Sequence, residues 1–211
     1  PQVFLTETRE YLYYDNERIA QYSFTDVGGL TDLGINFGRS AQLRAGYLYA
    51  TRKADVDTGP GVLPEREAVD EGITAQFVYD TRDAAFAPTR GLAATIEYMY
   101  TDDSLGADRD WQRLEAGARF ALPLRGDVIW LAAAGGSNLG SDLPPDRFFT
   151  LGGPGSFPGL ELAQFRAPEY WTVSGSYLWK FADVQTLRGE SMYIGAQIQG
   201  GAIANWLKGL E

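Results

Sequence analysis

A strict alternation of apolar and polar residues over long segments is the feature that most limits what this chain can fold into. It is clearest in residues 112–122, where one set of alternate positions reads Leu114, Ala116, Ala118, Phe120 and Leu122. The other set reads Arg113, Glu115, Gly117, Arg119 and Ala121. Successive side chains of a β-strand point to opposite faces of its sheet. A period of two therefore predicts a strand with one apolar and one polar face.

The same pattern predicts about nine or ten strands in the whole chain. The segments that show it are 3–14, 18–38, 41–50, 73–81, 92–100, 112–122, 128–137, 173–181 and 191–203. In the second of these, Val27-Gly28-Gly29 predicts a bend or a bulge. Short connections at 39–41, 84–90, 123–127 and 182–189 alternate with long ones at 53–70, 101–110 and 138–169.

Long strands joined alternately by short turns and long loops are typical of a transmembrane β-barrel. Strands in soluble proteins average about 5–6 residues, and several of the segments here run to about 9–11. We therefore predict an all-β, antiparallel barrel whose apolar face meets lipid and whose polar face lines a wet lumen. Arg113, Glu115 and Arg119 would then face the lumen. A soluble sandwich, or a soluble barrel that binds an apolar ligand, is the alternative, because its apolar face would form the core.

The composition argues against several other classes of protein. A net charge of −10 does not suit a nucleic-acid-binding surface, which needs clustered cations. The 211 residues include no histidine, the commonest general base and metal ligand, and no cysteine. No Gly-x-Ser-x-Gly sequence is present to mark a hydrolase. We expect no catalytic site, no cofactor and no metal in this chain.

One acidic stretch has two readings. Asp102, Asp103, Asp108 and Asp110 could bind Ca²⁺, but their spacing fits no EF-hand. A solvated acidic loop is the favoured interpretation.

Residues 146–160 form a shaped loop. This stretch holds four glycines and two prolines between aromatic residues, a density that neither a helix nor a central strand tolerates. Phe148, Phe149, Phe157 and Leu160 provide apolar anchors. Such a loop is expected to pack into something, although a surface turn would also fit the local sequence.

Two stretches, taken together, carry a resemblance to a known family. Residues 79–91, Tyr-Asp-Thr-Arg-Asp-Ala-Ala-Phe-Ala-Pro-Thr-Arg-Gly, resemble the "D-T-R-D … P-T-x-G" signature of the bacterial surface antigen superfamily. The matching positions are Asp80, Arg82, Asp83, Pro88 and Gly91. This superfamily of outer-membrane barrels includes the BamA-type insertases, the two-partner secretion transporters and the barrel of patatin-like type V autotransporters.

The second stretch resembles the loop-six sequence "G-G … V-R-G-F/Y" of the same family. It reads Leu-Gly-Gly-Pro-Gly-Ser-Phe-Pro-Gly-Leu over residues 151–160, and its matching positions are Gly152, Gly153, Phe157, Pro158, Gly159 and Leu160. Pro158 stands where the family has an arginine that points into the lumen and bonds to polar and acidic wall residues. The resemblance therefore implies a plug over 141–169 that is held by Phe157, Leu160 and backbone contacts rather than by an arginine. Asp80 and Arg82 are expected to belong to a lumen network that holds its tip.

The resemblance also implies a location and a function. The chain would be a single domain over 1–211, a fragment with about nine or ten of the sixteen strands of a family barrel, in the bacterial outer membrane. Without this arginine, the loop-six sequence resembles that of the patatin-like autotransporter branch. This resemblance implies a non-enzymatic barrel that anchors an upstream passenger and translocates or presents it. A BamA-type insertase is the alternative. The expected partners are outer-membrane lipid, the passenger and further copies of the chain paired through open sheet edges, and not nucleic acid.

Overall fold

The computed structural model describes residues 1–14, 17–61, 66–153, 156–184 and 190–204. One antiparallel sheet dominates it, with nine strands in the order β1-β2-β3-β4-β5-β6-β7-β10-β11. These are β1 (Gln2–Tyr14), β2 (Glu17–Phe37), β3 (Ala41–Thr58), β4 (Arg66–Asp80), β5 (Gly91–Thr101), β6 (Trp111–Leu124), β7 (Asp127–Ser137), β10 (Tyr170–Val184) and β11 (Glu190–Ile203). The predicted all-β, antiparallel architecture is confirmed.

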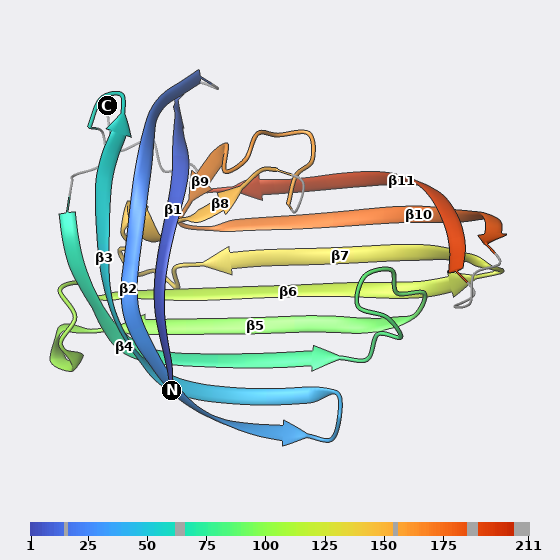
Figure 1. The fold of residues 1–211 in the computed structure, drawn as a ribbon, viewed down its shortest axis with the longest axis horizontal. Helices are drawn as coiled ribbons and strands as arrows, with labels where there is room; N and C mark the ends of the chain where they lie inside the picture. Colours follow the sequence, from blue (N-terminus) through green and yellow to red (C-terminus); the bar gives the residue numbers. More distant parts are fainter. Residues whose placement is uncertain (15–16, 62–65, 154–155, 185–189, 205–211) are drawn as a thin grey trace.

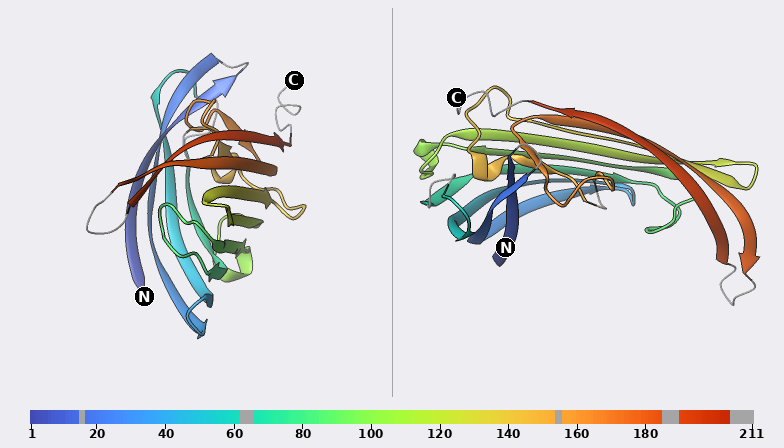
Figure 2. Two further views of the ribbon diagram at one scale, coloured as in Figure 1. Left: turned by 90° about the vertical axis from the view of Figure 1, so that its right-hand side faces the viewer. Right: turned by 90° about the horizontal axis from the view of Figure 1, so that it is seen from above.

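The connection between β7 and β10 has structure of its own. It contains the short helix η2 (Pro145–Arg147) and a two-stranded sheet of β8 (Phe149–Leu151) and β9 (Phe165–Ala167). The large sheet curves around this connection, which lies on its concave side (Figures 1 and 2). In the described residues the sheet does not close, because β1 and β11 each pair on one side only.

The connections of the sheet separate into two ends. Residues 38–40, 81–90 and 125–126 lie at one end, here called the short-turn end, on the right in Figure 1. The connections after β3, β5 and β7 lie at the other, here called the long-loop end; the one after β5 includes η1 (Asp103–Leu105). Arg125 and Gly126 have φ values of 53° and 100°, the positive angles that a two-residue type I′ hairpin turn needs. None of the described helices is long and apolar enough to cross a membrane.

The outward face is apolar, as the alternation predicts. Its exposed side chains include Leu33, Ile35, Phe37, Tyr47, Tyr49, Ile73, Ile96, Phe120, Leu131, Trp171, Tyr177, Trp179 and Ile198. The inner face is polar, and a cavity of about 340 Å³ on it is lined in part by Asp32, Arg44, Gln76, Glu97, Arg113 and Glu115. An apolar exterior around a charged interior is the arrangement of a membrane barrel and the reverse of a soluble one.

Two local predictions are wrong. Residues 53–70 are not a single loop, because β3 continues to Thr58 and β4 begins at Arg66. Polar side chains hid this extension, in which Lys53 pairs with Glu67 across the strands. Of the bend or bulge predicted at residues 27–29, the bulge is absent, because pairing with both neighbours is continuous there. Gly28 instead permits a close approach, since a Cβ there would lie 2.7 Å from the Cα of Ala50.

Candidate functional site

An ion pair network fixes the β7–β10 connection to the inner face of the sheet. Arg147 of η2 donates from Nε to Asp70 Oδ2 at 2.8 Å, and its Nη2 also bonds to Asp70. The same Nη2 lies 3.3 Å from Asp26 Oδ1 on β2. Asp70, on β4, is fully buried and also accepts from Trp111 Nε1 at 3.1 Å. One side chain of the connection therefore bridges two wall strands.

Three further residues complete the network. Arg109, in the loop after β5, donates to Asp146 at 2.7 Å and to Asp70 at 3.2 Å. Arg52 on β3 lies 3.7 Å from Asp146. The six members are Asp26, Arg52, Asp70, Arg109, Asp146 and Arg147, and we call them the ion pair network. Three carboxylates balance three guanidiniums, which limits the cost of burying them.

The network sets the charge state of the connection. Burial alone would raise the pKa of Asp146, but the hydrogen bonds and charge of Arg109, with the charges of Arg52 and Arg147, hold this pKa below its ordinary value. Asp146 therefore stays ionised and paired at neutral pH.

A second ionic contact joins the connection to β1. Arg166 on β9 bonds to Glu10 on β1, and the two side chains are 6% and 18% exposed. The Arg166 guanidinium also lies 5.4 Å from the ring centroid of Phe24, a fully buried residue of β2. Tyr13 of β1 donates to Glu161 at 2.5 Å. The connection is thus held to β1 as well as to β2, β3 and β4.

An apolar cluster holds the connection to β6 and β10. Phe149 of β8 is 1% exposed and packs with Trp111 and Leu143. Its ring lies 5.1 Å from the ring of Tyr170, and the Arg113 guanidinium lies 4.3 Å from it. The aromatic anchor of this segment is therefore Phe149.

The predicted loop-six residues form a turn within the connection. Gly152 and Gly153 have φ values of 127° and 88°, which glycine adopts readily. Gly153 N donates to Leu160 O at 3.1 Å, and Gly153 also bridges to Phe157. Pro158 and Gly159 are exposed.

The prediction that no arginine holds this plug is wrong, whereas a predicted backbone contact is present, because Ser156 O accepts from Gln199 Nε2 on β11. Phe157 and Leu160 are only partly buried, and neither belongs to the apolar cluster around Phe149. The arginines that hold the connection are Arg147 and Arg166, and neither stands at the family position, which is Pro158 here.

The "D-T-R-D" residues order their own turn. Arg82 donates to Asp80 from Nε at 3.0 Å and from Nη2 at 2.7 Å. Asp83 accepts from Thr89 N at 2.9 Å and from its hydroxyl, and the Thr89 hydroxyl lowers the pKa of Asp83. Gly91 has a φ of 107°. Among the described residues Asp80 and Arg82 form no hydrogen bond or ion pair with the β7–β10 connection. Residues 154 and 155 of its tip lie outside the described residues, so the part of Asp80 and Arg82 in holding the tip stays a prediction.

The predicted lumen residues lie on the inner face. Arg113 and Glu115 are 3.0 Å apart, and Glu115 accepts from the Tyr170 hydroxyl at 2.7 Å. Arg119 pairs with Ala132 in register and shares the face of Arg113. Arg113 and Glu115 line the cavity on this face.

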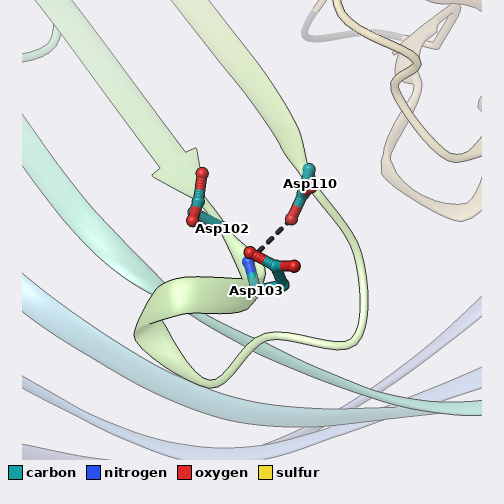
Figure 3. Close-up of side chains that lie close together, drawn as sticks. All are labelled: Asp102, Asp103 and Asp110. Atoms are coloured by element: carbon teal, nitrogen blue, oxygen red, sulfur yellow. Dashed lines mark hydrogen bonds between the residues drawn. The ribbon is translucent and has the colours of Figure 1, made fainter.

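The acidic loop does not need a cation to explain its geometry. Asp102, Asp103 and Asp110 bring carboxylate oxygens within 4.8 Å of one another (Figure 3). Asp110 accepts from Asp103 N at 2.7 Å, and Asp102 caps η1 by accepting from Ser104 N at 3.0 Å. Hydrogen bonds from Ser104 and Tyr100 lower the pKa of Asp102 to about 2. Asp108 points elsewhere and accepts from Val69 N at 2.7 Å.

The ion pair network and the Glu10–Arg166 pair were not among the sequence predictions. The sequence held a signal for the wall residues. Asp26, Arg52 and Asp70 are charged residues within strands, and each lies on the inner face. Ionisable groups within membrane-spanning segments point to function by default. Their partners Asp146 and Arg147 are far away in sequence, so pairing required the fold.

Comparison with known proteins identifies the family of this chain. The Omp85 superfamily domain matches residues 2–194. The chain belongs to the Omp85 superfamily. As an outer-membrane β-barrel of this family it lies in the bacterial outer membrane, and the soluble alternative is wrong.

Among solved structures, the chain is similar to BamA from Haemophilus ducreyi lacking POTRA domains 1-3. The TM-score is 0.77 at 14% identity, over 96% of this chain and 46% of that one. This likeness shows the fold, and the chain spans less than half the length of that structure. No curated protein matches the chain.

Proposed function

We propose that this Omp85 barrel anchors an upstream passenger in the outer membrane and translocates or presents it, and that the barrel itself is not an enzyme. The observation that carries the proposal is the β7–β10 connection, docked in a polar lumen by charged contacts. Ion pairs can be exchanged for water and for other polar groups, whereas a close-packed apolar core cannot. Opening of the lumen would require these ion pairs and the apolar cluster around Phe149 to separate.

The choice of a passenger follows from Pro158. The resemblance associates the family arginine at this position with insertases and secretion transporters, and this chain lacks it. The passenger would be a patatin-like lipase encoded upstream. Its hydrolytic chemistry would lie outside this chain.

Assembly of other barrels is the second candidate. Its support is the likeness in fold to a BamA barrel. An insertase would use the same polar lumen and movable connection, but its substrates would be other outer-membrane proteins.

Cells that produce the full-length protein distinguish the two candidates. We expect an added protease to cleave the upstream region on intact cells and a deletion of this barrel to abolish that cleavage. Amounts of folded porins, measured by heat-modifiable gel migration, should stay unchanged. A fall in folded porins with no surface-exposed passenger would reject the passenger role and support the insertase.

A further inference from the structure

The turn between β4 and β5 presents an apolar apex that the barrel itself does not cover. Residues 84–87 read Ala-Ala-Phe-Ala and are all exposed. Phe86 is 98% exposed, the most of any large apolar residue in the described chain. A phenylalanine exposed to water gains none of the free energy that burial of its ring would give. A partner that covers this apex would recover part of it.

The exposure is built into the turn. Arg82 bonds to Asp80 on one side and to Ala85 O at 3.3 Å on the other. Asp83 holds the returning chain at Thr89, and Thr81 N donates to Leu92 O at 2.8 Å. These bonds close the turn from both sides of the apex, so Phe86 is held out by an ordered backbone.

The turn is also directed toward the lumen. Trp130 on β7 donates from Nε1 to Pro88 O at 2.8 Å, although two strands separate β4 from β7. Trp130 pairs with Ala121, which is 3% exposed on the inner face. In Figure 1 the turn hooks back across β5 from the end of β4. The apex therefore lies on the lumen side of the sheet and away from the lipid-facing side.

Exposed arginines share the short-turn end with this apex, where the carboxylates of Asp80, Asp83 and Asp127 already accept hydrogen bonds. Arg39, Arg90 and Arg125 lie on the three described short turns, and all three are exposed. None of them forms an ion pair within the described part of the chain. Ser40 O accepts from Asp80 N at 2.7 Å, which ties the first of these turns to the second. The long-loop end instead carries the acidic loop of Asp102, Asp103 and Asp110.

We propose that the β4–β5 turn is a docking surface for an acidic polypeptide segment with apolar side chains, at the periplasmic mouth of the lumen. Short turns of outer-membrane barrels face the periplasm, so exported chain would meet this end first. Phe86 would pack against an apolar side chain of the segment, and the arginines would pair with its carboxylates. A peptide fits better than lipid, because Trp130 holds the turn on the lumen side. The inference rests on the proposed passage of polypeptide through the barrel, and it adds which kind of polypeptide segment the turn would bind.

The test uses the purified full-length protein in detergent and two fluorescein-labelled peptides. One is a twelve-residue peptide that alternates glutamate and leucine, and the other has lysine in place of each glutamate. We expect fluorescence polarisation to detect binding of the glutamate peptide only, weakening as salt rises. Phe86→Ala and Arg90→Glu should each weaken it about tenfold, the effect of a side chain worth about 1.4 kcal/mol. Trp130→Phe, which frees the turn, should also weaken it.

Phe37→Ala is the matched control, because Phe37 is an exposed phenylalanine on the outward face near the same end. Its affinity for the glutamate peptide should equal that of the unaltered protein. Equal binding of both peptides, or no effect of Phe86→Ala, would overturn the proposal. Binding to phosphatidylglycerol vesicles that depends on Phe86 would overturn it in favour of lipid. A photo-crosslink from position 86 to another part of the same chain would show that the surface is already occupied.

The two proposals can fail separately. Surface display of the passenger with no peptide binding would reject the docking surface alone. Peptide binding without a displayed passenger would reject the passenger role alone.

Discussion

Gly136 illustrates how one position without a side chain allows the lumen to hold an aromatic anchor. It lies on the inner face of β7, where Phe149 of the docked connection covers it. A Cβ built at Gly136 would lie 2.5 Å from Cε1 and Cζ of that ring. Phe149 is 1% exposed among Trp111 and Leu143, so its ring has little room to move away.

We therefore expect Gly136→Ala to destabilise the docked connection. Overpacking of a filled site costs about 1–3 kcal/mol, which would appear as a lower midpoint of urea unfolding in vesicles. Gly200→Ala is the control, because no atom lies within 4 Å of the Cβ position at Gly200. Equal midpoints for the two variants would show that Phe149 is not confined.

Asp70 is the residue on which the ion pair network depends most. It accepts from Arg109, Trp111 and Arg147 and is fully buried. Asp70→Asn would leave two buried guanidiniums with one carboxylate fewer, and breaking a buried pair costs about 3–5 kcal/mol. Asp32→Asn breaks the more exposed pair with Arg44 and should cost less than about 1 kcal/mol. Unfolding in urea, followed by heat-modifiable migration, would measure both, and similar costs would contradict a special role for the network.

At the scale of elements, the strands could be predicted from sequence and the docking of the connection could not. Alternation identifies a strand wherever its two faces meet different solvents, as in β6 between lipid and lumen. It is easily missed in residues 53–58, where the alternation is inverted: Lys53, Asp55 and Asp57 face outward, and Ala54 and Val56 face inward and pack in the cluster around Phe24. The contacts of the connection join residues far apart, such as Asp70 and Arg147 over 77 positions. Local patterns hold no information about such pairs.

The connection should be releasable through the Glu10–Arg166 pair. The chain has no cysteine, so Ser156→Cys supplies a single thiol as a reporter within the connection. Glu10→Arg places two guanidiniums together and should increase the rate of maleimide labelling at position 156 several-fold. Adding Arg166→Glu restores an opposite pair and should return the rate toward its starting value.

Glu7→Arg controls for the change of charge on β1, since Glu7 is 57% exposed and, in the described part of the chain, forms its one ion pair with Arg9. It should leave the labelling rate unchanged. A double variant that labels as fast as Glu10→Arg alone would show that the two side chains do not act as a pair.

At the scale of the whole molecule, the directions of the two edge strands restrict how the sheet can close. β1 and β11 both run from the short-turn end to the long-loop end, because an antiparallel sheet of nine strands has parallel edges. Outer-membrane barrels pair antiparallel throughout. An odd number of further strands must therefore lie between β11 and β1. If two copies of this sheet had the same orientation in the membrane, β1 of one copy would lie parallel to β11 of the other.

This geometry gives a prediction for the 211-residue chain alone. In detergent, where orientation is free, we expect it to self-associate through open edges, as unpaired strands do. In vesicles with all copies inserted the same way, Leu5→Cys on β1 of one copy should not form a disulfide with Ile198→Cys on β11 of another. Both positions are well exposed, at 74% and 79%, so reactivity does not limit the experiment. A vesicle-bound dimer with this cross-link and heat-modifiable migration would show that parallel edges can close the barrel, and the strand-parity argument would be wrong.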